Sequence, residues 1–292
     1  MEPLVPFPTH IEIQTTTYCS AQCSFCPHHS LHSTMNMGFM EEKLFYRIID
    51  ECSEHPIKQI SPYFNAEPLT DKRIFDFIRY IAQRCPQANI ELSITGQLLN
   101  NKMQEKLLQA PLGELRISSM GVRAEDYRRL MPGVSFEDTL ANIESFFDAF
   151  NQLSSRPYDA YIVTLDSILD REGAKENKEF WEARGVRIRS WEAVSRAGNV
   201  FNWKGPHHGE SIYGCHSARN THWMSILYNG NCVLCCMDWK SEIILGDTSA
   251  KTLKEIWESE EYSKIRDIST GQVQSPDDFL CKKCEWAITY QQ

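Results

Sequence analysis

Two kinds of apolar pattern alternate along the first two thirds of the chain. Stretches of period two, typical of β-strands, are followed by stretches in which apolar residues recur every three or four positions, typical of amphipathic helices. Strands are expected at residues 10–15, 57–64, 89–95, 114–119, 158–165 and 186–191. Helices are expected between them at residues 40–52, 71–84, 98–109, 136–150 and 175–184.

This order predicts an α/β fold with a parallel sheet, because a right-handed crossover through a helix joins neighbouring parallel strands. Six strand–helix units predict a partial (β/α)6 barrel, similar to part of a TIM barrel. Functional residues of such barrels follow the carboxyl ends of the strands. The residues just after each strand are therefore the first candidates for a site.

A smaller region is expected after the barrel. Pro206 and the glycines near it indicate a boundary, which gives a barrel domain at residues 1–204 and a C-terminal domain at residues 205–292. In the C-terminal part, Asn229-Gly230 lies between two short apolar runs, a pattern typical of a β-hairpin. A helix is expected at residues 252–257.

Composition narrows the cellular setting. The 292 residues are 42% hydrophobic, enough for a globular core, and the formal charge is −9 with no long basic block. Nucleic-acid binding through phosphate neutralisation is therefore not expected. No apolar run approaches 18 residues, and the N-terminus lacks the basic and apolar parts of a signal peptide. We expect a cytoplasmic protein without membrane association.

Three of the 11 cysteines, Cys19, Cys23 and Cys26, lie within eight residues directly after the first expected strand. Chance alone would give this C-x3-C-x2-C spacing roughly 0.016 times in such a chain. Three thiolates can converge on one metal centre and leave a fourth ligand position open. The alternatives are a buried or disulfide-bonded cysteine cluster and a zinc knuckle, which usually has C-x2-C pairs and four protein ligands.

The segment resembles the signature of the radical S-adenosylmethionine (radical SAM) superfamily. This resemblance implies that the three cysteines hold a [4Fe–4S] cluster whose fourth iron binds the amino and carboxylate groups of S-adenosylmethionine. Phe25 matches an aromatic residue that packs near the adenine. The implied chemistry is cleavage to a 5′-deoxyadenosyl radical, which abstracts a hydrogen atom, with a flavodoxin or ferredoxin-type protein as electron donor.

Other strand ends resemble the family pattern as well. Asn65, Ala66 and Glu67 match the family's G-G-E-P motif, whose backbone and acid bind the methionine amino group, although both glycines are replaced. Asn tolerates a positive φ better than most residues, so the turn is compatible with this change. Thr95 matches the start of a T-N-G-x-L-L element, and Ser118 the strand end that contacts the methionine carboxylate or ribose. Either residue is alternatively an ordinary turn former.

A second set of cysteines lies beyond residue 205. Cys215, Gly230 and Cys235 follow the spacing C-x14-G-x4-C, and Cys281-x2-Cys284 follows near the end of the chain. This resembles a SPASM-type auxiliary domain in its truncated twitch form. The resemblance implies one auxiliary [4Fe–4S] cluster held by Cys215, Cys235, Cys281 and Cys284.

Two points about this second set stay open. Only the G-x4-C spacing selects Cys235 over its neighbours Cys232 and Cys236, and a zinc site is an alternative because C-x2-C pairs suit tetrahedral zinc. Cys232 and Cys236 are also candidate hydrogen-atom donors, as spare thiols near an active site.

The predicted function is that of a radical SAM oxidoreductase or epimerase. The short chain, with one auxiliary cluster and no appended peptide-recognition domain, favours a small polar substrate. Dehydrogenation or epimerisation of a sugar, an aminocyclitol or a related biosynthetic intermediate is expected. One alternative is a radical SAM maturase of a ribosomally made peptide or protein. A second is a non-catalytic iron–sulfur or zinc protein.

Overall fold

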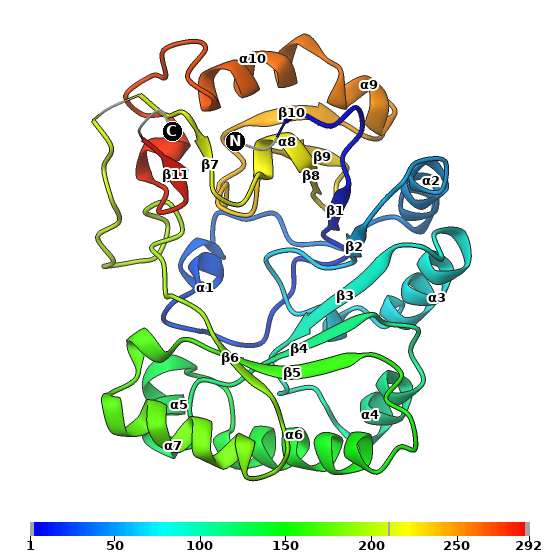
Figure 1. The fold of residues 1–292 in the computed structure, drawn as a ribbon, viewed down its shortest axis with the longest axis vertical. Helices are drawn as coiled ribbons and strands as arrows, with labels where there is room; N and C mark the ends of the chain where they lie inside the picture. The colour runs from blue at the N-terminus through cyan, green and yellow to red at the C-terminus, as the bar shows by residue number, and fades with distance from the viewer. Residues whose placement is uncertain (1–2, 210, 290–292) are drawn as a thin grey trace.

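One curved sheet of nine strands organises the computed structural model, which describes residues 3–209 and 211–289 (Figure 1). The strand order is β10-β9-β8-β1-β2-β3-β4-β5-β6. All neighbours from β8 to β6 are parallel, whereas β9 and β10 are antiparallel to their neighbours. Helices α2, α3, α4, α6 and α7 follow the outer side of the curve, so the barrel is open and covered on one face (Figure 1).

The strands of the parallel part are short. They are β1 His10–Ile13, β2 Gln59–Ser61, β3 Asn89–Ile94, β4 Glu114–Ser118, β5 Asp159–Thr164, β6 Ile188–Ser190 and β8 Trp223–Ile226. The sheet is completed by β9 Asn231–Val233 and β10 Ile244–Asp247. A separate antiparallel pair is formed by β7 Gly214–Cys215 and β11 Ala287–Ile288.

Ten helices lie in the described residues. Those of the barrel part are α1 Pro27–Leu31, α2 Glu42–Cys52, α3 Ile74–Arg84, α4 Asn101–Leu108, α5 Ala124–Leu130, α6 Phe136–Asn151 and α7 Arg171–Glu182. Those of the C-terminal part are α8 Arg219–His222, α9 Leu253–Trp257 and α10 Glu260–Ser269. No helix in residues 3–209 and 211–289 has the length and apolar character needed to cross a membrane.

The predicted α/β fold is confirmed, including the partial parallel barrel and a C-terminal hairpin and helix. Two elements begin or end at other residues than expected, in each case because of a neighbouring residue. The second strand stops at Ser61 because Pro62 has no N–H to donate to a sheet. The third helix begins at Ile74, since the Asp71 carboxylate accepts the Arg73 N–H at 3.0 Å and holds a turn there. Helices α1, α5, α8 and α10 were not among the expected ones.

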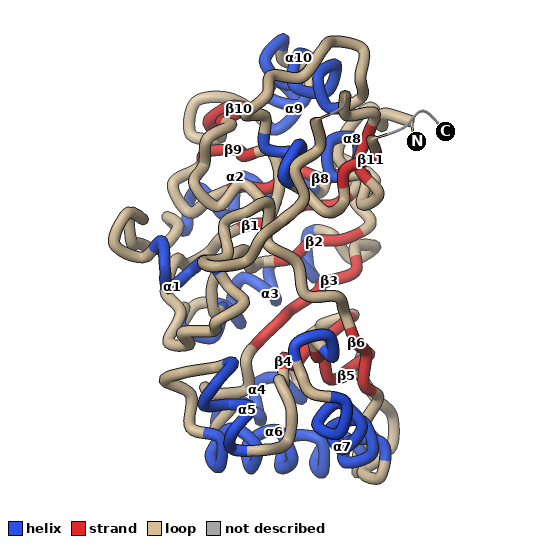
Figure 2. The backbone as a smooth tube through the Cα atoms, turned by 90° about the vertical axis from the view of Figure 1, so that its left-hand side faces the viewer, coloured by secondary structure: helices blue, strands red, loops and turns tan. Residues whose placement is uncertain are grey.

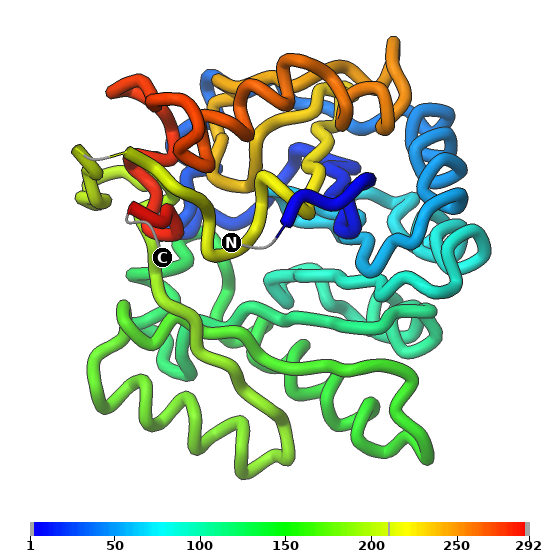
Figure 3. Tube along the Cα trace, turned by 45° about the horizontal axis from the view of Figure 1, so that its top comes forward, coloured from blue at the N-terminus to red at the C-terminus, as the bar shows by residue number. Residues whose placement is uncertain are grey.

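The hairpin belongs to the same sheet as the barrel strands. Strand β8 pairs in parallel with β1, from His10 beside Trp223 to Ile13 beside Ile226. Gly230 forms the tight turn between β8 and β9, with a φ of 93° and its N–H donating to the Leu227 carbonyl at 2.9 Å. The division proposed at residue 204 therefore separates two segments that share one sheet. Figure 3 shows the C-terminal segment beside the N-terminal strand.

The two faces of the sheet differ in polarity. In β4, Leu115 and Ile117 are fully buried in the main core, which the outer helices cover. Glu114, Arg116 and Ser118 alternate with them and lie on the opposite, inner face. Figure 2 shows α4, α5, α6 and α7 grouped at one end of the molecule, next to β4, β5 and β6. The apolar outer face stabilises the fold, and the inner face is left for polar residues.

The aromatic packing between α2 and α3 provides a stability test. Phe77 is fully buried and stacks on Phe45 with ring centroids 4.0 Å apart. We expect Phe77→Ala to lower the free energy of unfolding by about 3–5 kcal/mol, from lost burial and the cavity left behind. Urea denaturation would measure it. Phe201 is 74% exposed, so Phe201→Ala should stay within about 0.5 kcal/mol of the wild type. Equal effects of the two substitutions would contradict this view of the core.

Candidate functional site

The first cysteine set lies on the loop between β1 and α1. The loop is anchored to the segment after α5: the Ser24 N–H donates to the Leu130 carbonyl at 2.9 Å, and the Gln22 N–H to the Pro132 carbonyl at 3.2 Å. The three thiols are close enough to influence one another. Burial raises the pKa of Cys23 well above its ordinary value, and the neighbouring Cys26 and Cys19 thiols raise it further. The structure thus brings the three predicted ligands together.

The protonation of these thiols couples cluster binding to proton release. Burial raises the pKa of Cys19 to about 12 and also raises the pKa of Cys26. These raised pKa values favour the neutral thiols when no metal is bound. Iron is bound by thiolates, so loading of the cluster would release these protons and replace them with metal charge.

Glu67 forms hydrogen bonds that join the segments following β1, β2 and β3 at the carboxyl ends of these strands. Its carboxylate accepts the Leu69 N–H at 3.1 Å and the Thr95 N–H at 2.8 Å, and its own N–H donates to the Tyr18 carbonyl at 3.1 Å. The side chain is buried, which raises its pKa, while the Thr95 and Leu69 hydrogen bonds oppose that rise. Each oxygen keeps a lone pair for a further donor. Glu67 therefore fixes the loop next to the cysteines and remains a predicted S-adenosylmethionine ligand.

The turn before Glu67 has the geometry that its altered sequence requires. Asn65 has a φ of 53°, in the left-handed region that glycine normally occupies. Asn is one of the few other residues that adopt this conformation at low cost. Ala66 follows it, half-buried. The turn is thus formed without the two glycines, and the roles of Asn65 and Ala66 toward S-adenosylmethionine stay predictions.

The other predicted cofactor residues lie at the same edge of the sheet. Thr95 directly follows β3, and Ser118 is the last residue of β4; both are half-buried. Phe25 lies on the cysteine loop and packs against a small apolar cluster that contains Met120 and Tyr127. The structure therefore brings the predicted cofactor-binding residues to the carboxyl ends of β1 to β4.

A polar network on the inner face was missed by sequence reasoning. At its centre Arg116 contacts the Glu91 carboxylate at 2.7 Å and the Glu114 carboxylate at 2.6 Å, and donates to the Tyr161 hydroxyl at 2.9 Å. Arg189 donates to the same hydroxyl at 3.1 Å. Polar residues alternate with apolar ones in β3 and β4, and this pattern could have predicted a polar inner face.

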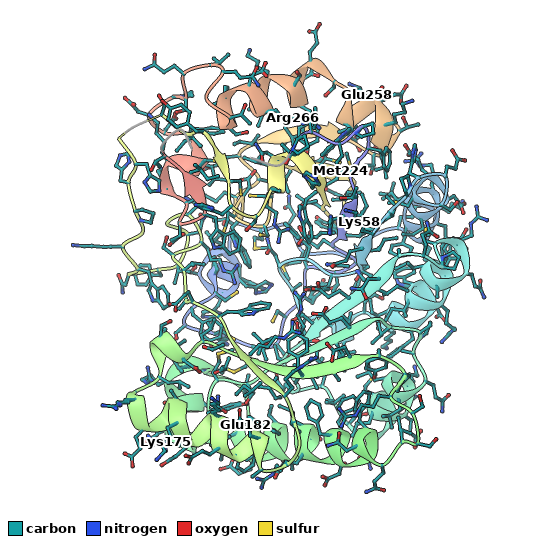
Figure 4. The ribbon with its side chains drawn as sticks, in the orientation of Figure 1. Lys58, Lys175, Glu182, Met224, Glu258 and Arg266 are labelled. Atoms are coloured by element: carbon teal, nitrogen blue, oxygen red, sulfur yellow. The ribbon has the colours of Figure 1, made fainter. Side chains whose placement is uncertain are left out.

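The two carboxyl groups of this network differ, because burial raises the pKa of Glu91 whereas the pKa of Glu114 is lowered. Burial alone would raise the pKa of Glu114, but hydrogen bonds from Tyr161 and Arg116 outweigh it and hold the pKa below its ordinary value. Burial raises the pKa of Tyr161 to about 12. The indole of Trp191, which is 43% exposed, lies under the Arg116 guanidinium at 5.2 Å. The inner face is therefore charged, hydrogen-bonded and partly open. Figure 4 shows side chains entering the space inside the curve of the sheet.

The second cysteine set lines one pocket in the C-terminal part. Its walls include Cys215, Cys235, Cys281 and Cys284, together with apolar residues such as Leu234, Met237, Trp286 and Ala287. Two backbone amides already donate to sulfur. The Met237 N–H lies 3.5 Å from the Cys235 Sγ, and the Trp286 N–H lies 3.4 Å from the Cys284 Sγ. Amide hydrogen bonds to thiolate are a common feature of iron–sulfur sites, so these residues fit an auxiliary cluster.

The neighbouring thiols are placed differently. Cys232 is fully buried in the main core, where it pairs in register with Ile226 and Gly246. Cys236 is half-buried and is not part of the pocket wall. The position of Cys235 in the wall supports its selection as a ligand. Of the two candidate hydrogen-atom donors, Cys236 is the better placed.

The spacing of the cysteines also bears on the zinc alternative. Within residues 3–209 and 211–289, no three Cys, His, Asp or Glu side chains converge closely enough to hold a single metal ion. A tetrahedral zinc would require such convergence, with sulfur about 2.3 Å from the metal. A four-iron cluster separates its thiolates further, since each binds a different iron.

Comparisons with known proteins agree with this site. The model of the radical SAM superfamily matches residues 13–170, more than half of the chain. The chain belongs to the radical SAM superfamily. A second model, SPASM, described as an iron–sulfur cluster-binding domain, matches residues 215–285. The cofactors of this radical SAM protein are thus S-adenosylmethionine, a [4Fe–4S] cluster and an auxiliary iron–sulfur centre.

Solved structures share the radical SAM fold at low identity. BtrN in complex with AdoMet and 2-DOIA is 18% identical, with a TM-score of 0.67, and the match covers 98% of this chain and 94% of BtrN. Streptococcus suis SuiB bound to precursor peptide SuiA is 16% identical, with a TM-score of 0.73 and coverage of 97% and 72%. Native anSMEcpe with bound AdoMet is 13% identical, with a TM-score of 0.66 and coverage of 96% and 87%. No curated protein sequence matches the chain.

Substitution of two adjacent cysteines tests the ligand assignment. After anaerobic reconstitution we expect about eight irons per chain in the wild type. Cys235→Ala should lower this to about four, because a cluster ligand is lost, whereas Cys236→Ala should keep about eight. Iron and sulfide analysis with electron paramagnetic resonance would measure it. The assignment is wrong if the Cys236 substitution removes four irons and the Cys235 substitution none.

Proposed function

We propose that this radical SAM protein abstracts a hydrogen atom from a small polar metabolite bound on the inner face of the sheet. The observation that carries the proposal is the network around Arg116, Tyr161 and Arg189, which offers charged and hydrogen-bonding groups to a ligand. These groups already pair with one another, but an apolar substrate would displace water from their remaining hydrogen-bonding positions, at a cost of about 1–3 kcal/mol for each donor or acceptor left unpaired. A sugar, an aminocyclitol or a related intermediate supplies hydroxyl or amino groups that replace water there.

The position of this network relative to the two cysteine sets supports the proposal. Cys19, Cys23 and Cys26 follow the carboxyl end of β1. Strand β9 runs back along β8, so Cys235, two residues beyond Val233, lies near the start of β8. The inner face thus extends between the two sets.

When bound, the clusters and S-adenosylmethionine supply a 5′-deoxyadenosyl radical and a centre for one-electron transfer. The chain's own residues bind and orient the substrate. Arg189 and Trp191 are exposed residues of the inner face and would contact it, whereas Arg116 holds Tyr161 and Glu114 in place. The outcome would be dehydrogenation or epimerisation, with Cys236 as the candidate hydrogen donor in the second case.

The likeness to BtrN supports a small substrate. The BtrN complex holds 2-DOIA, and the match covers nearly all of both chains. Maturation of a ribosomally made peptide is the second candidate, favoured by the likeness to SuiB bound to precursor peptide SuiA. A flavodoxin or ferredoxin-type electron donor belongs to either proposal.

Isotope transfer tests the reaction directly. The reconstituted protein would be incubated without oxygen with S-adenosylmethionine, a reductant and candidate substrates deuterated at one carbon. We expect deuterium in 5′-deoxyadenosine from one labelled position of a sugar or aminocyclitol, because the radical abstracts that atom. Mass spectrometry would detect it. A dehydrogenase should consume one S-adenosylmethionine per product, whereas an epimerase should take up solvent deuterium. Label transfer only from a peptide would replace this proposal by the second candidate.

A pair of arginine substitutions tests the binding face. Arg189 contacts Tyr161 on the inner face, whereas Arg184 pairs with Glu144 at the end of α7 on the outer side. We expect Arg189→Gln to raise the KM for the identified substrate about tenfold or more, since a hydrogen bond to a charged group contributes about 1.5–3 kcal/mol. Arg184→Gln should leave KM within twofold. Equal KM values in both variants would place the substrate elsewhere.

A further inference from the structure

Arg219 lies between the auxiliary cysteine pocket and the inner face of the barrel. It begins α8, a few residues after Cys215, and its guanidinium Cζ stacks over the Trp223 ring at 3.9 Å. Its Nη1 lies 2.7 Å from Glu12 Oε1, and the side chain is 16% exposed. Its Nε is buried and has no hydrogen-bond partner among the described residues. The side chain thus contacts one acid and one ring, and neither its Nε nor its Nη1 makes a hydrogen bond of good geometry among the described residues.

Arg219 also borders the pocket itself. It contributes to the same wall as the four cysteines, and it is the one charged residue among those that line this pocket in the described chain. Burial lowers the pKa of Arg219, but the Cys236 thiol, Glu12 and the Cys235 thiol raise it to a net value above the ordinary one. The guanidinium is therefore a permanent positive charge beside the pocket.

A positive charge at this place changes the redox balance of a cluster. A [4Fe–4S] cluster with four thiolates is an anion and becomes more negative when it is reduced. A buried cation stabilises the reduced form more than the oxidised form, and the effect is larger in a low-dielectric interior than in water. A hydrogen bond donated to a cluster sulfur acts in the same direction.

Glu12 weakens the effect of the Arg219 charge on the cluster, and it belongs to β1 of the barrel. Its Oε1 pairs with Arg219, and its Oε2 accepts the Ser225 hydroxyl at 2.8 Å. Ser225 and Ser61 lie beside Glu12 in the sheet register, so Glu12 shares the inner face of β1 with the polar row that continues into β2. Its negative charge offsets part of the guanidinium charge at the pocket.

We propose that Arg219 is a positioning residue that raises the reduction potential of the auxiliary cluster, and that Glu12 sets the size of this effect. The inference rests on the proposed function only in taking Cys215, Cys235, Cys281 and Cys284 as the cluster ligands. In redox terms one electron enters the cluster from the titrant, with no bond made or broken. The potential then determines how readily the cluster accepts an electron during turnover.

Potentiometric titration of the full chain tests the proposal. The variants would be made in a Cys19→Ala, Cys23→Ala, Cys26→Ala background, so that only the auxiliary cluster reports in electron paramagnetic resonance. We expect Arg219→Met to lower the ratio of reduced to oxidised cluster at least tenfold at a fixed potential, a shift of about 59 mV for a one-electron couple. Glu12→Gln should shift the ratio in the opposite direction.

Two further variants keep the test decisive. Arg219→Lys keeps the charge without the fixed fork of donors, and should lie between wild type and Arg219→Met. Arg123→Met is the matched control, since Arg123 is also a largely buried arginine paired with carboxylates but lies at the start of α5, away from the pocket. It should leave the potential unchanged.

The outcomes separate this inference from the proposed function. An unchanged potential in Arg219→Met, with four irons retained, overturns the proposal. If Arg219→Met does not bind the cluster, the reduction potentials of Arg219→Lys and Glu12→Gln test the proposal instead. Potential shifts of the same sign in these two variants would overturn the proposal. Failure to form labelled 5′-deoxyadenosine in the wild type would contradict the proposed function alone, because the titration needs no substrate.

Discussion

The parallel pairing of β8 with β1 is the contact on which the arrangement of this protein depends. It joins residues 10–13 to residues 223–226, so the strand that leads to the first cysteine loop also supports the hairpin that carries Cys235. Because β8 runs in the same direction as β1, and β9 returns, the two cysteine sets come to different ends of the same pair of strands. A single sheet thus fixes the separation of two redox sites without a linker between them.

The second constraint is the division of polarity across that sheet. Apolar residues at every other position bury the outer face under α2, α3, α4, α6 and α7. The residues between them must then face inward, and in this chain they include arginine, glutamate and tyrosine. Charged groups in such a space are stable only when they are paired, which explains why Arg116 has two carboxylates and a hydroxyl around it. The division of polarity across the sheet therefore accounts both for the polar residues of the inner face and for the pairing that holds them in place.

Sequence patterns predicted the features that depend only on residues close together in the chain. The six barrel strands, the hairpin turn at Gly230 and the family were predictable, since period-two alternation, an Asn-Gly turn and a C-x3-C-x2-C spacing are all local. The contacts between Arg219 and Glu12, and between Arg116 and Glu91, were not. Such pairs depend on which strands become neighbours and in which register, and no local pattern records that choice. The parallel addition of β8 to β1 was missed for the same reason.

The long separation between β1 and β8 also has a consequence for synthesis. During translation the barrel strands up to β6 emerge first, and β1 then has β2 on one side only. Until residues 223–226 leave the ribosome, β1 is an edge strand with unpaired N–H and C=O groups, next to a loop of free thiols. Pairing of such distant segments is slow, and open edges favour aggregation. The nascent chain is therefore most vulnerable before its last third has been made.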